Sequence, residues 1–160
     1  MRTQSNETAP ASLFASIQYR PESVRTLAKL HDLLMGTGAL KARTRALVYL
    51  AVAIVNESPF CIRESELRAR ELGITEDESR DVEAETDYSF PEKERIALRF
   101  ARELTRTADA ERRTLEMLDT FFTAEERAEL TMVISLANMT TRIANGLRIS
   151  SGRSVLRVAS

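Results

Sequence analysis

The segment NESPFCIRESELRARELG, residues 56–73, contains the only cysteine of this 160-residue chain, Cys61. Ser58 lies three residues before the cysteine and Ser65 four residues after it. Serine is a preferred helix N-cap and proline is common at the next position, so Ser58 and Pro59 predict a helix with Cys61 in its first turn. The exposed N–H groups of a first turn favour an anion, and a thiol placed there tends to have a lowered pKa and higher reactivity.

Two acidic residues act against a reactive thiolate. Glu57 and Glu64 lie four residues before and three residues after Cys61, and negative charges nearby disfavour ionisation of the thiol. A free cysteine is also often a small buried apolar residue. The sequence leaves both interpretations of Cys61 open. Ser58 is more simply an N-cap than a nucleophile, because no histidine is nearby in the sequence.

A stripe of polar residues marks an otherwise apolar segment near the C-terminus. Its members recur at steps of four and three, which places them on one face of a helix: Thr131, Ser135, Asn138, Arg142 and Asn145. Buried polar groups need partners, which interhelical hydrogen bonds or a subunit contact would supply. The alternative is a small-molecule pocket beside Cys61, in which Arg142 binds a carboxylate or another anionic group.

The single histidine, His31, shares the apolar face of its predicted helix and is interpreted as a packed core or interface residue rather than a base. One cysteine and one histidine cannot supply the ligand set of a metal site. Glycine-rich phosphate loops and a G-x-S-x-G elbow are absent from the sequence. We therefore expect neither a metal nor another cofactor.

Hydrophobic periodicity and capping signals predict an all-α protein. Proline at position 21 opens the first strong helix, and the glycines at 36 and 38 end it. Capping-box patterns occur at Thr75 with Glu78 and at Thr123 with Glu126, and Asp109 is the predicted cap of a short helix. The expected helices cover about 21–36, 41–56, 59–73, 89–108, 110–121 and 124–147, with a short acidic helix that begins after Thr75.

Composition bounds the class of protein. Hydrophobic residues make up 43% and charged residues 29%, with only five glycines, which is typical of a soluble helical domain. A net charge of −1 gives no electrostatic case for nucleic acid or an anionic membrane. The most apolar run, 46–55, is too short to span a bilayer, and the N-terminus has no signal-peptide core. With one cysteine, a reducing, cytoplasmic location is expected.

We expect a flexible N-terminal segment at 1–19, one domain at 20–148 and a C-terminal tail at 149–160. The last residues, SVLRVAS, could add a short strand or dock on a partner. The strongly apolar helices predicted at 41–56 and 124–147 give a reason to expect contacts between subunits.

Two long stretches resemble the AhpD-like alkylhydroperoxidase branch of the carboxymuconolactone decarboxylase family. They are LVYLAVAIVNESPFCIRESELRARELGITEDE at 47–78, and FPEKERIALRFARELTR with FTAEERAELTMVISLANMTTRIANGL between 90 and 147. The resemblance covers about 20–148. It implies an AhpD-like domain of six to seven helices that forms homo-oligomers, as dimers, trimers or hexamers. Asn138 and Arg142 match an N-x-x-x-R pattern of that family.

The same resemblance implies a site whose chemistry has changed. The family relies on two cysteines in N-x-C-x-x-C-x-x-x-H, with the histidine one turn further on and a glutamate twelve residues before the first cysteine. Aligned on Cys61, these positions hold Ser58, Ser65 and Ala46. Only the peroxide-attacking thiol remains. Ser58 cannot form the disulfide, Ser65 cannot act as a base near neutral pH and Ala46 carries no proton, so we do not expect the dithiol peroxidase cycle.

Three functions remain open. The first is a repurposed enzyme that carries out non-redox or single-thiol chemistry on a small organic substrate, such as decarboxylation, isomerisation or rearrangement. Its candidate catalytic residues are Cys61, Ser58 and Ser65, and its candidate substrate-binding residues are Arg142, Asn138, Glu57 and Glu64. The second is a one-cysteine hydroperoxide reductase that uses an external thiol, and the third is a non-catalytic oligomeric binding protein. We favour the first, because the core and the polar stripe are kept while the relay is lost.

Overall fold

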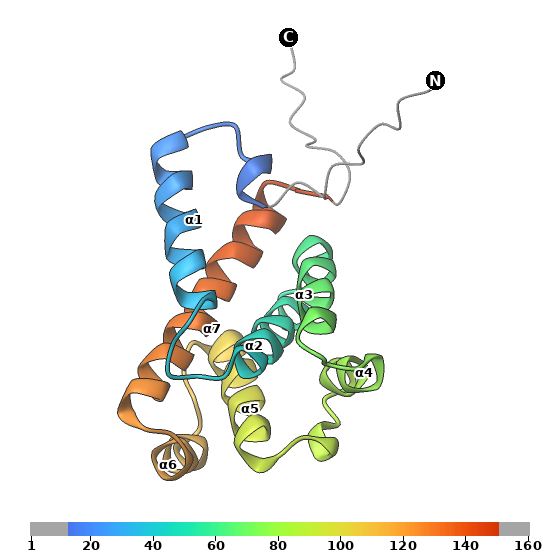
Figure 1. The fold of residues 1–160 in the computed structure, drawn as a ribbon, viewed down its shortest axis with the longest axis vertical. Coiled ribbons are helices and arrows are strands. Elements are labelled where there is room, and N and C mark those ends of the chain that lie inside the picture. The colour runs from blue at the N-terminus through green and yellow to red at the C-terminus, as the bar shows by residue number, and fades with distance from the viewer. Residues whose placement is uncertain (1–12, 151–160) are drawn as a thin grey trace.

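The computed structural model describes residues 13–150, and every regular element among them is a helix (Figure 1). The elements follow in the order η1 (Phe14–Ser16), α1 (Pro21–Met35), α2 (Ala42–Val55), α3 (Pro59–Glu71), α4 (Glu76–Ala84), η2 (Asp87–Ser89), α5 (Glu92–Thr107), α6 (Arg112–Phe121) and α7 (Ala124–Gly146). The all-α prediction is confirmed for this part of the chain, and the seven expected helices form within a few residues of their predicted bounds.

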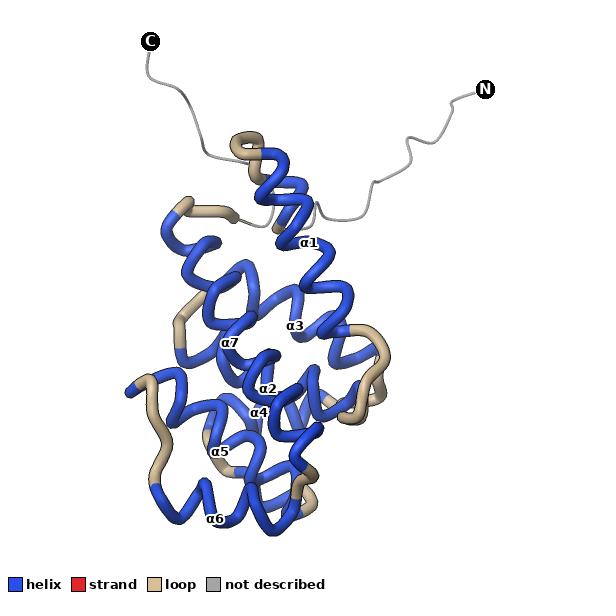
Figure 2. The backbone as a smooth tube through the Cα atoms, turned by 90° about the vertical axis from the view of Figure 1, so that its left-hand side faces the viewer, coloured by secondary structure: helices blue, strands red, loops and turns tan. Residues whose placement is uncertain are grey.

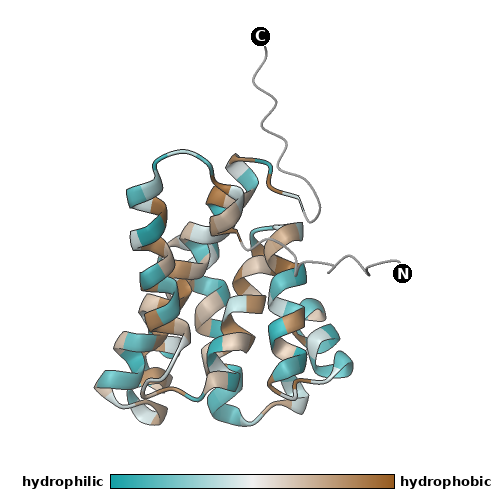
Figure 3. Cartoon of the chain, turned by 45° about the horizontal axis from the view of Figure 1, so that its top comes forward, coloured by the Kyte–Doolittle hydropathy of each residue, from teal (hydrophilic) through white to brown (hydrophobic). Residues whose placement is uncertain are grey.

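Helix α2 occupies the centre of the fold and is flanked by α3, α5 and α7 (Figure 1). Every residue from Thr44 to Ala53 is buried, as expected for a helix that is apolar on nearly all sides. Helix α1 lies toward one end of the molecule and α5 and α6 toward the other (Figure 2). Apolar residues concentrate where the helices face one another, and polar residues cover the outer faces (Figure 3). The apolar character of α2 is thus satisfied within one chain, and homo-oligomerisation stays a prediction.

The local signals that start the helices are partly confirmed. Both capping boxes form, with the Thr75 and Thr123 side chains each accepting from the backbone N–H of the third helical residue. Ser58 is the N-cap residue of α3 and Pro59 its first residue, but the Ser58 side chain makes no capping hydrogen bond. The prediction for Asp109 was wrong. Glu111 is the N-cap residue of α6, while Asp109 Oδ1 accepts from the Ala110 N–H at 2.8 Å.

This contrast between two N-cap residues gives a stability test. We expect Thr123→Ala to lower the free energy of unfolding by about 1 kcal/mol, because it removes the acceptor for the Glu126 N–H. Ser58→Ala is the matched control and should not lower it, because no capping bond is lost and a buried hydroxyl without a hydrogen-bond partner is removed. Urea unfolding followed by circular dichroism measures both values. A loss for Ser58→Ala equal to that for Thr123→Ala would show that Ser58 does cap α3.

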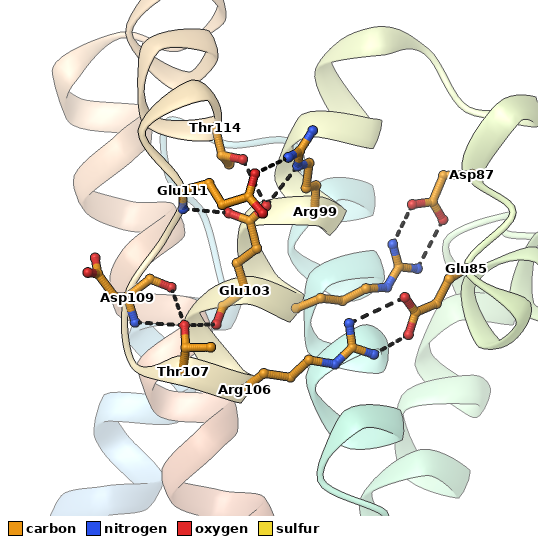
Figure 4. A network of polar contacts seen from close by, with 10 residues as sticks. Glu85, Asp87, Arg99, Glu103, Arg106, Thr107, Asp109, Glu111 and Thr114 are labelled. Carbon is orange, nitrogen blue, oxygen red and sulfur yellow. Dashed lines mark hydrogen bonds and ion pairs between the residues drawn. The ribbon is translucent and has the colours of Figure 1, made fainter.

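A network of ion pairs fastens α5 to η2 and to the start of α6 (Figure 4). It joins Arg102 to Asp87, Arg106 to Glu85, and Arg99 to both Glu103 and Glu111. The Arg102–Asp87 pair is the most buried of these, with side chains 7% and 15% exposed, and Arg102 also donates to the carbonyl of Val82 at 2.9 Å. These contacts fix the α4–α5 connection at the end of the molecule away from Cys61.

A second buried ion pair orders the α1–α2 connection. Arg45 Nη1 lies 2.8 Å from Glu129 Oε1, with side chains only 4% and 12% exposed. The other carboxylate oxygen accepts from the N–H groups of Ala39 and Leu40 at 2.6 and 3.1 Å. The backbone passes so close that a side chain at position 38 would meet the carboxylate, which accounts for Gly38. Glu129 therefore attaches the connection before α2 to the N-terminal part of α7.

The start of the described chain bears on the boundary predicted for the flexible N-terminal segment, 1–19. Leu13 is buried and Phe14 packs against the same cluster as Cys61, so the final part of the segment expected to be flexible contacts the core. The SVLRVAS tail lies outside the described residues. Among the helices of 13–150, none combines the length and the hydropathy needed to cross a membrane.

Candidate functional site

A cavity of about 240 Å³ opens beside Cys61 and is bounded by η1, α1, α2 and α3. Its walls are mainly apolar, with Leu13, Phe14, Met35, Ala46 and Phe60 among them. The groups capable of chemistry that line it are His31, Tyr49, Cys61, Glu64, Ser65 and Arg68. Helices α1, α2 and α3 thus place several ionisable groups around one partly open cavity.

Cys61 is only 3% exposed and lies in the first turn of α3. Burial raises the pKa of its thiol, and the charge of Glu64 acts in the same direction. The Ser58 hydroxyl opposes this shift, but its Oγ makes no well-formed hydrogen bond, so burial prevails. Of the two interpretations that the sequence left open, the structure supports the buried thiol.

Three polar atoms close to Cys61 have no hydrogen-bond partner among the described residues: Ser58 Oγ, Ser65 Oγ and Glu64 Oε1. Ser58 and Ser65 are 0% and 6% exposed. A buried polar atom without a partner destabilises a fold by about 1–3 kcal/mol and is rare in native proteins. Because Ser65 and Glu64 both line the cavity, this wall offers hydrogen-bonding capacity to whatever binds there.

His31 reaches the cavity from α1. Its ring packs edge-on against Phe14 and Tyr49, with centroids 5.4 and 6.0 Å apart. Burial lowers the pKa of His31, the nearby Asp32 opposes the shift and the charge of Arg68 reinforces it. These contacts agree with the packed ring that the sequence predicts, but the His31 side chain is 31% exposed and borders the cavity instead of lying in the core. Its place beside Cys61 was missed, because nothing in the sequence indicates that α1 and α3 meet at one cavity.

Tyr49 borders both groups. Burial raises the pKa of its phenol, which hydrogen-bonds to the Thr140 hydroxyl, and the proximity of Cys61 adds to the shift. The phenol therefore remains protonated and serves as part of the wall. Of the relay positions, Ala46 and Ser65 line the cavity with Cys61, and Ser58 is buried next to Cys61 without lining the cavity.

The remaining candidate residues lie elsewhere. Asn138 Nδ2 donates to Thr105 Oγ1 at 2.9 Å, and Asn56 Nδ2 donates to Asn138 Oδ1 at 3.0 Å. Arg142 is exposed and donates to the Asn138 side chain. This part of the polar stripe therefore makes the interhelical hydrogen bonds that the sequence suggested. Neither Asn138 nor Arg142 lines the Cys61 cavity, and their role in substrate binding stays a prediction.

Glu57 is exposed in the α2–α3 connection, with a left-handed φ of 47°, and lines a separate open groove beside α3 and α4. Glu57 does not line the Cys61 cavity, so its role in binding a substrate there stays a prediction. Within residues 13–150, no group of three or more His, Cys, Asp or Glu side chains is arranged to hold a metal ion.

Comparison with known proteins places this site in context. The sequence of residues 21–103 matches the model of the carboxymuconolactone decarboxylase family. No protein of curated function shows a significant similarity in sequence.

Three solved structures share the fold. An uncharacterized peroxidase-related protein from Silicibacter sp. TM1040 superposes with a TM-score of 0.78 at 20% identity, over 86% of this chain and 74% of the other. A putative antioxidant defence protein AhpD from Agrobacterium tumefaciens gives 0.77 at 24% identity, over 86% and 98%. A variant of the debrominase Bmp8 in complex with 2,3,4-tribromopyrrole gives 0.80 at 13% identity, over 92% and 79%.

Proposed function

The chain belongs to the carboxymuconolactone decarboxylase family, and we propose that it is a divergent enzyme of this family that acts on a small, mainly apolar organic molecule. The molecule binds in the cavity beside Cys61 and undergoes proton-transfer chemistry, such as isomerisation or decarboxylation, rather than dithiol peroxide reduction. The observation that carries the proposal is the cavity itself, a mainly apolar space whose wall holds two polar atoms without partners: Ser65 Oγ, at a position of the lost relay, and Glu64 Oε1.

The size and lining of the cavity support this class of ligand. An apolar cavity of about 150 Å³ is large enough to bind benzene, so about 240 Å³ accommodates one substituted ring. The debrominase relative of the same fold was solved with a brominated pyrrole, which is a ring of this size. A small apolar body with one or two polar substituents would complement the apolar walls and the Ser65 and Glu64 oxygens.

The state of Cys61 supports non-redox chemistry over the one-cysteine reductase. The thiolate is the form that attacks peroxide, and burial holds this group as the thiol. Isomerisation and decarboxylation need proton donors and acceptors but no external oxidant or reductant. The cavity contains such groups in His31, Glu64 and the Cys61 thiol.

The proposal is tested by binding of one-ring fragments, such as pyrrole, phenol and cyclohexanone, observed by saturation-transfer NMR. We expect the wild-type protein to bind some of these fragments. The Ala46→Leu variant should not bind them, because its larger side chain fills the cavity. Ala51→Leu is the matched control, since Ala51 is buried on the same helix but does not line the cavity. Both variants are first checked for folding by circular dichroism.

Two results would contradict the proposal. One is the absence of fragment binding to folded wild type. The other is binding that persists unchanged in folded Ala46→Leu, because the fragments would then occupy another part of the surface.

A further inference from the structure

We propose that His31 and Glu64 form a proton-transfer pair in the Cys61 cavity, in which the imidazole removes a proton from carbon and the carboxyl group protonates oxygen. The substrate class that fits such a pair is a small cyclic ketone or its enol. This inference rests on the proposed function and deepens it by assigning the acid and the base.

The two groups reach the same space from different helices. His31 comes from α1 and Glu64 from α3, and both line the cavity. His31 Nδ1 lies 3.6 Å from Asp32 Oδ1, so the neutral tautomer that keeps its proton on Nδ1, toward this carboxylate, has Nε2 as its free acceptor nitrogen. Glu64 Oε1 is buried and has no hydrogen-bond partner among the described residues. A ring bound between the two side chains would contact both.

Burial pushes both groups toward their neutral forms. It lowers the pKa of His31, so that the imidazole is a free base at neutral pH, and it raises the pKa of Glu64, so that more of the carboxyl group keeps its proton. Asp32 and Arg68 act on His31 in opposite directions, and Arg63 partly offsets the shift of Glu64. Both shifts favour the forms that general acid–base catalysis uses, a neutral imidazole as base and a carboxylic acid as proton donor.

The remaining titratable groups of the cavity do not take over these roles. Burial raises the pKa of both Cys61 and Tyr49, so both stay protonated near neutral pH and neither is a base. Arg68 is exposed and pairs with Glu71 at 3.0 Å. His31 is thus the neutral base among the described residues that line the cavity.

Enolisation by this pair balances without an oxidant or reductant. The C–H bond next to the carbonyl breaks, its proton passes to His31 Nε2, and its electron pair forms a carbon–carbon double bond. The carbonyl oxygen takes the proton of Glu64 and becomes a hydroxyl. Ser65, 6% exposed and with an unpaired Oγ, is placed to donate a hydrogen bond to that oxygen. The reverse sequence returns the ketone, and solvent exchange restores the two protonation states.

The test is the rate at which cyclohexanone takes up deuterium next to its carbonyl in D₂O, followed by NMR. We expect wild type to accelerate the exchange over buffer, and His31→Phe and Glu64→Gln each to reduce that acceleration at least tenfold while still binding the ketone. His31→Phe keeps an aromatic ring against Phe14 and Tyr49, and His31→Gln serves as a second variant if it unfolds. Glu66→Gln is the control, because Glu66 lies on the same helix but outside the cavity.

The pH profile separates a base from a packing residue. The chain has a single histidine, so its imidazole proton resonance titrates without ambiguity. Because the reaction needs a neutral His31 and a protonated Glu64 together, we expect the exchange rate to pass through a maximum as the pH is raised, whereas a packing role for His31 predicts no such maximum. Binding without acceleration, or acceleration that both variants retain, would overturn the pair and leave the proposed cavity intact. Absence of cyclohexanone binding by wild type that does bind other one-ring fragments would also overturn the pair, whereas no binding of any fragment would remove the proposed function itself.

Discussion

Replacing Glu129 by alanine is expected to lower the free energy of unfolding by about 3–5 kcal/mol, because it leaves the buried charge of Arg45 without its partner. The same substitution removes the acceptor for the N–H groups of Ala39 and Leu40. Arg45 has no way to reach solvent from its position, since its side chain is 4% exposed and also donates to the carbonyl of Leu40 at 2.7 Å.

Glu116→Ala is the matched control. Glu116 pairs with Arg112 on the surface of α6, where both side chains are largely exposed, and such pairs contribute about 0.2–1 kcal/mol. Urea unfolding of the wild type, Glu129→Ala and Glu116→Ala gives the three free energies of unfolding. Hydrogen exchange at the Ala39 and Leu40 amides reports directly on the order of the α1–α2 connection. A loss below about 1 kcal/mol for Glu129→Ala would mean that the pair is not buried in the folded protein.

Cys61 is expected to react with iodoacetamide at pH 7 at least about tenfold more slowly than an exposed cysteine. Its pKa is raised by burial, so at pH 7 a smaller fraction of the thiol is ionised, and each unit of pKa corresponds to a tenfold change in that fraction. Its rate should still rise with pH where that of an ordinary thiol has levelled off. Burial of the sulfur slows the reaction further.

The comparison needs a second protein with one exposed thiol, which Cys61→Ser combined with Ser135→Cys provides, because Ser135 is exposed on α7. In urea the two thiols should react at similar rates, which shows that the folded structure causes the difference. A Cys61 that reacts as fast as the exposed control, and consumes peroxide with an external thiol, would favour the one-cysteine reductase over the proposed function.

The elements of this fold were largely predictable because their signals are local. The capping boxes at Thr75 and Thr123 involve residues three apart, and the buried run of α2 needs only hydropathy. The error at Asp109 is also local in origin. An aspartate next to a helix can bond its own neighbour's N–H instead of capping, and the sequence does not distinguish these outcomes.

The site was predictable only in part, because it is assembled from distant segments. Cys61 and Ser65 share a face of α3 through their spacing of four, so their proximity follows from the sequence. His31 reaches the cavity only because α1 packs beside it. Arg142 does not line the cavity and donates to the side chain of Asn138 instead. Arg45 and Glu129 lie 84 residues apart, and no local pattern marks either as buried.

The contacts between α2 and α7 have a consequence for how the chain folds as it is synthesised. Hydrogen bonds from Arg45 to Glu129, from Asn56 to Asn138 and from Asn145 to the carbonyl of Asn56 join residues 82 to 89 positions apart. In a nascent chain that has emerged from the ribosome only as far as α6, the apolar helix α2 therefore lacks α7 as a packing partner. Native burial of α2 waits for the last helix, and until then that helix is a surface for chaperones or for aggregation.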